Sequence, residues 1–183
     1  MKQQAEIQDE DILKAFGNQL TKNKAFEWLL HKYHQRTYWH IRRIVINHDD
    51  ADDVCQNTLI KIWEHLGSFK AESKLYTWIF RIASNEALAF LNKKKQHQSI
   101  EGTSPELLEH LVTGSYFNGN AAELKLQQAI LQLPDKQRLV FNMKYYDQMK
   151  YEDMSEVLDT SVGALKASYH HATKKIEEFL LRA

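Results

Sequence analysis

The chain has 183 residues, which is enough for one domain or two small ones. Its hydrophobic residues (43%) and charged residues (26%) are in a balance that excludes wholesale disorder, and 24 basic side chains against 24 acidic ones point to no polyanionic partner by net charge alone. Two prolines and six glycines disfavour a many-turned β-sandwich, and no apolar run approaches the length of a membrane span. We therefore expect an all-α, soluble, intracellular protein with no direct membrane insertion. Its single cysteine, Cys55, can form no disulfide within the chain.

The first 95 residues are predicted to hold three helices. Apolar residues recur at three-to-four spacing over residues 26–44, which indicates one long amphipathic helix. A second helix is expected over residues 51–66, directly after aspartates that suit the positive end of a helix dipole. Residues 67–73 have the composition of a loop, and a third helix is expected over residues 74–94.

The third of these helices carries more aromatic side chains than one buried face can hold. Tyr76, Trp78 and Phe80 alternate with cationic residues that include Lys74 and Arg81. Aromatic rings beside cations give single-stranded nucleic acid both stacking surfaces and charge neutralisation. The same pattern is also compatible with the core helix of a tightly packed bundle, so the residues by themselves leave both interpretations open.

Residues 96–120 interrupt the helical pattern. They are rich in serine, glycine, asparagine and threonine, which is typical of a flexible linker, with one short helix expected over residues 105–112. The linker divides the chain into a first domain over residues 1–95 and a second over residues 121–183. Its charged residues are all acidic, namely Glu101, Glu106 and Glu109.

Four shorter helices are predicted in the second domain, over residues 121–132, 135–145, 151–158 and 162–180. The last two are separated by a three-residue turn that ends at Ser161, a good N-cap. A short helix, a tight turn and a longer basic helix are the pattern of a helix-turn-helix, although any small helical bundle can imitate it.

The last helix has a polar face that suits nucleic acid. Val162, Leu165, Tyr169, Ala172 and Ile176 form its expected buried stripe, and the side chains away from that stripe are hydrogen-bond donors. A helix of this kind can enter the major groove of DNA. The donors are Lys166, Ser168, His170, His171, Lys174 and Lys175. The alternative is a face that is merely solvated.

Two sets of segments resemble parts of a bacterial RNA polymerase sigma factor. Residues 52–63, 69–73 and 76–87 resemble region 2 of that family, and residues 131–141 and 151–175 resemble region 4 with its helix-turn-helix. Because no further domain lies between the two, the chain resembles the extracytoplasmic-function (ECF) class of the sigma-70 family.

Some residues depart from the family pattern. Asn57 stands in place of the usual acid and Leu59 in place of the usual phenylalanine, while Ser168, His171 and Thr173 replace common arginines. These changes affect the promoter sequence that is expected, not the class. The turn of the helix-turn-helix often holds glycine and here holds Asp159, a residue type that tolerates the left-handed conformation well.

The resemblance implies two small helical domains with three sets of binding residues. The core polymerase contact maps to Asp52, Asp53, Gln56, Asn57, Ile60 and Lys61. The minus-10 contact, which captures the opened DNA strand, maps to Phe69, Lys70, Ala71, Glu72, Ser73, Lys74, Tyr76, Trp78, Arg81 and Asn85. The minus-35 contact maps to Lys166, Ser168, His170, His171, Lys174 and Lys175, with Arg138 as a further phosphate contact.

The resemblance also implies the partners. They are the β and β′ subunits of core RNA polymerase, promoter DNA and an anti-sigma factor, with the acidic linker expected to run through a basic channel of the polymerase. The protein is expected to be cytoplasmic, to have no enzymatic activity and to use no cofactor or metal.

Two other functions remain as alternatives. A helix-turn-helix regulator that binds duplex DNA without polymerase would explain the second domain, but it has no use for the aromatic loop and helix of the first. A helical metal-dependent phosphohydrolase is suggested only by the pair His48 and Asp49, because the other signatures of such enzymes are missing. His31 and His34 likewise lack a suitably spaced third ligand.

Overall fold

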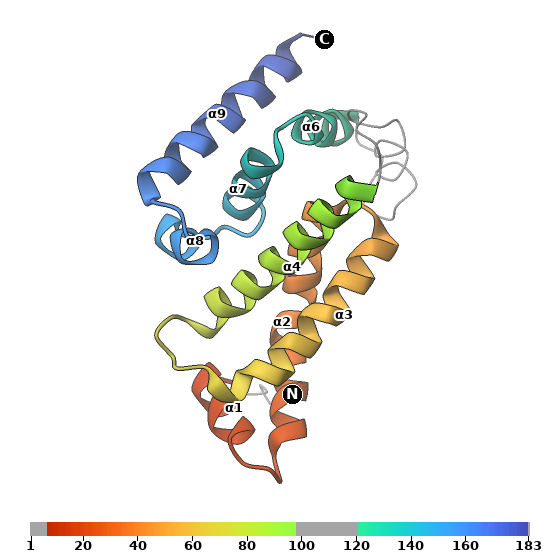
Figure 1. Ribbon diagram of the computed structural model, residues 1–183. Helices are drawn as coiled ribbons and strands as arrows, with labels where there is room; N and C mark the ends of the chain where they lie inside the picture. Colours follow the sequence, from red (N-terminus) through yellow and green to blue (C-terminus); the bar gives the residue numbers. More distant parts are fainter. Residues whose placement is uncertain (1–6, 98–120, 183) are drawn as a thin grey trace, which may run out of the picture.

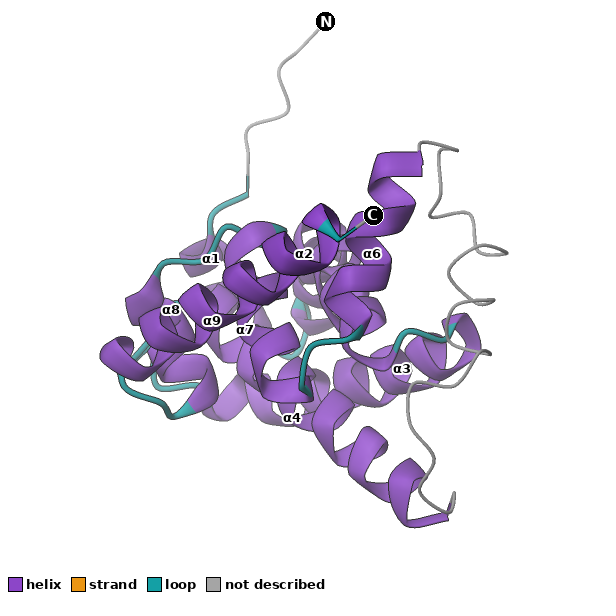
Figure 2. Cartoon of the chain, turned by 90° about the horizontal axis from the view of Figure 1, so that it is seen from above, coloured by secondary structure: helices purple, strands orange, loops and turns teal. Residues whose placement is uncertain are grey.

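The computed structural model of the protein describes residues 7–97 and 121–182 (Figure 1). Within these ranges the chain consists of helices and connecting loops, with no strand (Figure 2). The N-terminal lobe contains α1 (Asp9–Phe16), α2 (Lys22–Val45), α3 (His48–His65), the 3-10 helix η1 (Leu66–Ser68) and α4 (Leu75–His97). The C-terminal lobe contains α6 (Ala121–Leu131), α7 (Asp135–Tyr145), α8 (Tyr151–Leu158) and α9 (Val162–Leu181). The all-α prediction is confirmed.

Most helices lie where the sequence predicts them. The bounds of α7 and α8 are as expected, and α9 ends within one residue of its predicted end. The helix α4 continues to His97, so the first residues assigned to the linker are helical. Helix α1 was not predicted from the sequence, and the short helix expected over residues 105–112 lies outside the described residues.

A three-helix core of α2, α3 and α4 forms the N-terminal lobe, with α1 packed on α2. The buried side chains of α2 follow the helical period, so one stripe of the helix faces its neighbours throughout its length. They include Ala25, Leu29, Tyr33, Thr37, Ile41 and Ile44. On the facing helices Ile62, Ile79 and Phe80 are fully buried.

The chain reverses between α2 and α3 in a very short turn. Ile46 has a φ of 71°, and the N–H of Asn47 donates to the carbonyl of Val45 at 2.9 Å. Positive φ is strained for a β-branched residue, and the burial of the Ile46 side chain offsets that strain. The side chain of Asn47 then accepts from the N–H of Asp50 at 3.1 Å and caps α3.

The helix-turn-helix of the C-terminal lobe is formed by α8 and α9. Asp159 ends α8 in the left-handed conformation (φ 49°, ψ 48°), as its position in place of a glycine suggested. The hydroxyl of Ser161 accepts from the N–H of Ala164 at 3.3 Å and so caps α9. The buried face of α9 packs on α6, α7 and α8.

The two lobes pack directly against each other. The helix α7 lies on α2, and α8 lies on α4 (Figure 1). One hydrophobic cluster continues across this boundary and includes Phe80 from the first lobe and Met143, Met154 and Leu165 from the second. A second, smaller cluster around Phe141 and Ile176 lies within the C-terminal lobe alone.

Candidate nucleic-acid and polymerase interface

The outer face of α3 displays all six residues expected to contact core polymerase. Asp52, Asp53, Gln56, Asn57, Ile60 and Lys61 are exposed, whereas Val54, Thr58 and Ile62 of the same helix are buried. Ile60 is unusual because 55% of this large apolar side chain is exposed. An apolar side chain surrounded by polar ones on a helix face is typical of a protein-binding surface. Lys61 also pairs with Glu86 of α4 at 2.6 Å.

The loop before α4 forms one side of an open polar cleft of about 620 Å³. Six of the residues expected to bind the minus-10 strand line it, four from the loop and two from α4, and the aromatic rings of Phe69 and Trp78 lie 5.3 Å apart. The cationic side chains of Lys70 and Arg81 are exposed. The remaining lining comes from Ser68, Glu72, Ser73, Thr77, Glu156 and Asp159. A cleft with rings and cations on one side suits a flipped base and its phosphates.

Ala71 gives this loop a strained backbone. Its φ is 54°, in the left-handed region that residues with a Cβ atom seldom adopt. Strain of this kind costs of the order of 1–3 kcal/mol and persists where the surrounding structure imposes it, often at binding sites. The loop is therefore held in a defined shape before any ligand arrives.

Tyr76 belongs to the core more than to the cleft. Its ring lies 4.3 Å from that of Phe80, the guanidinium of Arg36 lies 4.6 Å from its centroid, and it does not line the cleft. Burial raises the pKa of its hydroxyl above the ordinary value. Trp78, in contrast, is half-buried and faces the cleft. The two aromatic residues that the sequence left ambiguous thus have different roles. Asn85 lies further along α4 and is exposed.

The polar face of α9 is available to solvent as predicted. Lys166, His170, His171, Lys174 and Lys175 are exposed and Ser168 is half-buried, whereas Leu165, Ala172 and Ile176 are buried. Lys175 donates to the amide oxygen of Gln137 at 3.0 Å.

The expectation that Arg138 contacts phosphates is wrong for this arrangement of the two lobes. Its side chain is buried and pairs with Asp135 at 3.0 Å, because α7 turns it inward toward the other lobe.

Two features of the site were missed by the sequence analysis. The first is the acidic side of the cleft, because Glu156 of α8 and Asp159, the residue after α8, lie about 80 residues from the loop that they face. The second is an apolar groove of about 400 Å³ on the C-terminal lobe, lined by Leu126, Phe141, Tyr145, Tyr169, Ile176 and Leu180 among others. The aromatic residues Tyr145 and Tyr169 were the available signal for that groove.

The comparisons with known proteins identify the lobes. Residues 29–97 match the family description Sigma-70 region 2, and residues 123–176 match Sigma-70, region 4. Together the two matches cover most of the chain, in the order predicted.

The chain belongs to the sigma-70 family.

Relatives in that family match along most of their length. The chain is 28% identical over 174 residues to the RNA polymerase sigma-H factor of Pseudomonas aeruginosa, covering 86% of each. It is 29% identical over 166 residues to the ECF RNA polymerase sigma factor SigW of Bacillus subtilis, covering 85% of this chain and 89% of that one. The name of the second relative agrees with the ECF class inferred from the sequence.

Two solved structures share the fold. One is the sigma factor RpoE of Bartonella quintana in complex with the anti-sigma factor NepR, with a TM-score of 0.70, 23% identity, and coverage of 86% of this chain and 97% of that one. The other is CnrH in complex with the cytosolic domain of CnrY, with a TM-score of 0.68, 22% identity, and coverage of 94% and 96%. At this identity the likeness establishes the fold.

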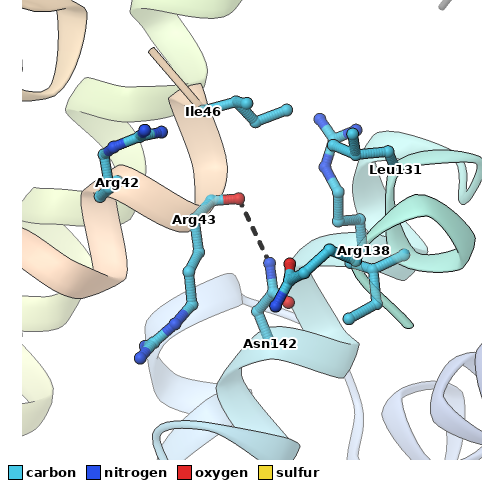
Figure 3. A pocket seen from close by; sticks show the side chains of 8 residues that line it. Arg42, Arg43, Ile46, Leu131, Arg138 and Asn142 are labelled. Carbon is cyan, nitrogen blue, oxygen red and sulfur yellow. Dashed lines mark hydrogen bonds between the residues drawn. The ribbon is translucent and has the colours of Figure 1, made fainter. Parts of the chain in front are cut away.

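Region 2 and region 4 of this sigma-70 family member meet around a small cavity of about 30 Å³. Arg42 and Arg43 contribute from α2, Ile46 from the turn after it, and Arg138 and Asn142 from α7 (Figure 3). The amide of Asn142 donates to the backbone carbonyl of Arg43 at 3.3 Å across the boundary. The cavity has room for about one water molecule, so it is a packing feature of the boundary and not a ligand site.

Within residues 7–97 and 121–182, no cluster of three or more His, Cys, Asp or Glu side chains is placed to hold a metal ion. The helices of the described ranges include none that is both long and apolar enough to cross a membrane.

Proposed function

We propose that this chain is an ECF-type sigma factor that binds core RNA polymerase and directs promoter-specific initiation. The observation that carries the proposal is that one chain contains both a region 2 match and a region 4 match. Both regions expose side chains of the kinds expected to bind polymerase and DNA. In this function the protein is not itself an enzyme. It acts in the cytoplasm, where the polymerase transcribes.

Each surface has one part in that function. The exposed face of α3 binds the β and β′ subunits through Asp53, Gln56 and Ile60 and their neighbours. The face of α9 enters the major groove of the minus-35 element, where lysines neutralise phosphates and Ser168 and Lys166 read base edges. These assignments are supported by the exposure of Asp53, Gln56, Ile60 and Lys166, whereas Ser168 is half-buried.

The cleft before α4 captures an unstacked base of the minus-10 element. Flipping a base out of the duplex costs a few kcal/mol, and stacking on an aromatic ring returns about 1–3 kcal/mol per base. Phe69 and Trp78 provide the rings, and Lys70 and Arg81 face the adjoining phosphates. We infer that Tyr76 acts mainly by supporting this wall through its contact with Phe80.

An anti-sigma factor is part of the proposal as well. One of the two solved structures described above is a complex of a sigma factor with an anti-sigma factor. A partner of this kind for the present chain would lower the yield of its transcripts when added in equimolar amount.

The test is in vitro transcription with core polymerase and a promoter library. We expect transcripts that depend on the chain and start from a shared pair of upstream elements. The variant Lys166→Ala with Lys174→Ala, which alters only the face of α9, should lose most of them. If the chain binds duplex DNA but gives no transcript with core, the helix-turn-helix regulator is the correct function instead.

A further inference from the structure

We propose that the hydroxyl of Thr77, at the floor of the cleft before α4, reads the edge of the base that this cleft captures. This role rests on the function proposed above and adds to it the group that determines which base is accepted. Thr77 is therefore a specificity-determining residue of the minus-10 contact, although it was not among the residues expected there from the sequence.

The Thr77 side chain is buried, and its hydroxyl is not engaged. The residue lines the cleft, yet only 2% of it is exposed, so it lies at the floor of the cleft and not at its rim. Among the residues that the structure describes, the Oγ1 atom of Thr77 has no hydrogen-bond partner. A buried hydroxyl in this state has lost its hydration without gaining a bond within the protein. A ligand that supplies the partner therefore gains binding free energy at this point.

The place of Thr77 in α4 explains why its hydroxyl is not engaged. A buried threonine within a helix can donate to the carbonyl four residues earlier, as Thr58 of α3 does to Val54 at 2.7 Å. For Thr77 that carbonyl belongs to Ser73, which lies in the loop before α4 begins at Leu75. Because the loop does not follow the helical path, the hydroxyl of Thr77 keeps both its donor and its acceptor for a ligand.

The rings and cations of the cleft cannot distinguish one base from another. Phe69 and Trp78 offer stacking surfaces, and every base has a face that can stack on them. Lys70 and Arg81 are exposed cations that suit phosphates, which carry no sequence information. These four residues therefore provide affinity, and discrimination must come from a group that forms a hydrogen bond with a base edge.

The other hydrogen-bonding groups of the cleft are less suited to this task than Thr77. Ser68 donates to the carbonyl of His65 at 2.8 Å, and Ser73 donates to that of Lys74 at 3.5 Å. The carboxylates that line the cleft are exposed, so a base that bonds to them only replaces water. At Thr77, in contrast, a base with the wrong edge leaves a buried hydroxyl without a partner, and this situation gives strong discrimination.

The experiment is transcription by core polymerase and the chain from a pool of promoters in which each position of the minus-10 element is varied to all four bases. A barcode in the transcribed region of each promoter reports the preference at each position. Thr77→Val keeps the shape of the side chain and removes the hydroxyl. We expect the preference to fall about tenfold at one position and to remain nearly unchanged at the others, because one hydroxyl contacts one base. Thr77→Ser keeps the hydroxyl and should retain most of the preference.

Thermal unfolding separates this role from a structural one. Because Thr77→Val loses no hydrogen bond within the protein, its Tm should equal or exceed that of the wild type. The matched control is Thr37→Val in α2. Thr37 is 1% exposed and its Oγ1 atom likewise has no partner within residues 7–97 and 121–182, but the residue does not line the cleft. The control should keep the wild-type preference at every position.

Three outcomes would overturn the role of Thr77. In the first, Thr77→Val keeps the wild-type preference at every position. In the second, Thr37→Val relaxes the same preference. In the third, Thr77→Val lowers the Tm and reduces transcription evenly from all promoters, which would make the residue structural.

Failure of the sigma-factor function has a different signature, because the wild type would then give no chain-dependent transcript. Binding of a pool of randomised single strands of about 10 nucleotides to the chain alone still tests Thr77 in that case. Enrichment of one base that is lost in Thr77→Val and kept in Thr37→Val would support the contact, and a wild type that enriches no base would overturn it. If the wild type transcribes and Thr77→Val keeps its preferences, the function stands and only the role of Thr77 is wrong.

Discussion

The Nδ1 atom of His40, in the middle of α2, lies 2.8 Å from the carboxylate of Asp147, a residue 107 positions later in the chain. The other ring nitrogen lies 2.8 Å from the hydroxyl of Ser84 in α4. Because a carboxylate only accepts, Nδ1 donates to Asp147, while Nε2 shares a hydrogen bond with the hydroxyl of Ser84. The imidazole therefore joins α2, α4 and the turn after α7 at a point where its side chain has no exposed surface.

Replacement of Asp147 by alanine should lower the free energy of unfolding by about 1–3 kcal/mol, because it leaves a buried His40 donor without a partner. Arg43 loses its partner in the same variant. Urea denaturation followed by circular dichroism measures the change. Asp147→Asn, which keeps an acceptor for His40, should cost less. An alanine variant as stable as the wild type would contradict the role of this contact.

On α3, Asp53→Ala with Gln56→Ala should weaken binding to core polymerase at least tenfold, equivalent to about 1.4 kcal/mol. Both side chains are exposed, so the thermal stability of the chain should not change. Fluorescence anisotropy with labelled chain gives the affinity. The control Asp11→Ala with Gln19→Ala alters exposed positions elsewhere and should bind normally. Equal affinities for both variants would remove α3 from the interface.

Removal of one phosphate-contacting lysine from α9 should reduce the salt slope of DNA binding by about 1, equally on all sequences. Lys174→Ala is expected to behave in this way. Ser168→Ala should instead change the preferred sequence, at a cost of about 1–3 kcal/mol at one base pair. Binding to duplexes that differ at single positions, measured at several salt concentrations, separates the two effects. A uniform loss for Ser168→Ala would exclude base reading by this residue.

In the cleft, Lys70→Ala with Arg81→Ala should impair promoter opening without loss of core binding. Both side chains are exposed, so the fold should remain intact. Permanganate reactivity of thymines in the minus-10 element should fall, and a promoter with a premelted bubble should be partly rescued. The control Lys14→Ala with Lys136→Ala removes the same charge elsewhere. Normal opening by the cleft variant would contradict the assignment.

Tyr76→Ala is expected to act differently from the cleft variant. Because its ring packs on Phe80, the change should lower thermal stability as well as opening. Tyr76→Phe keeps the ring and should restore both. A Tyr76→Ala chain of normal stability that fails to open the promoter would instead place Tyr76 in direct contact with DNA.

Cys55 should be unreactive in the folded chain. Burial raises the pKa of its thiol to about 11, with a further contribution from Asp52. A rise of the pKa leaves the thiol protonated at pH 8, so the thiolate fraction is about 100-fold smaller than in the unfolded chain. Reaction with Ellman's reagent at pH 8, with and without denaturing urea, measures this difference. Equal rates in both states would mean that α3 opens readily at this position.

Much of this protein follows from its sequence by local rules. The helical period fixed the buried stripes of α2 and α9, and Ser161 marked the start of α9. The same period also predicts the exposed polar faces of α3 and α9, because the spacing of residues along the sequence determines which of them share a face of the helix. Helix α1 was missed because its short acidic segment resembles a solvated tail, although Ile12 and Phe16 are buried.

Only the tertiary structure decided how distant residues combine. Arg138 and Lys74 were both predicted from the sequence to contact DNA. The packing of the two lobes instead buries Arg138 and pairs Lys74 with Asp153. Tyr76 and Trp78, two residues apart, point to the core and to the cleft. The contact of His40 with Asp147 spans more than half of the chain. No local pattern encodes such pairings, because they depend on how the helices pack against one another to form one core.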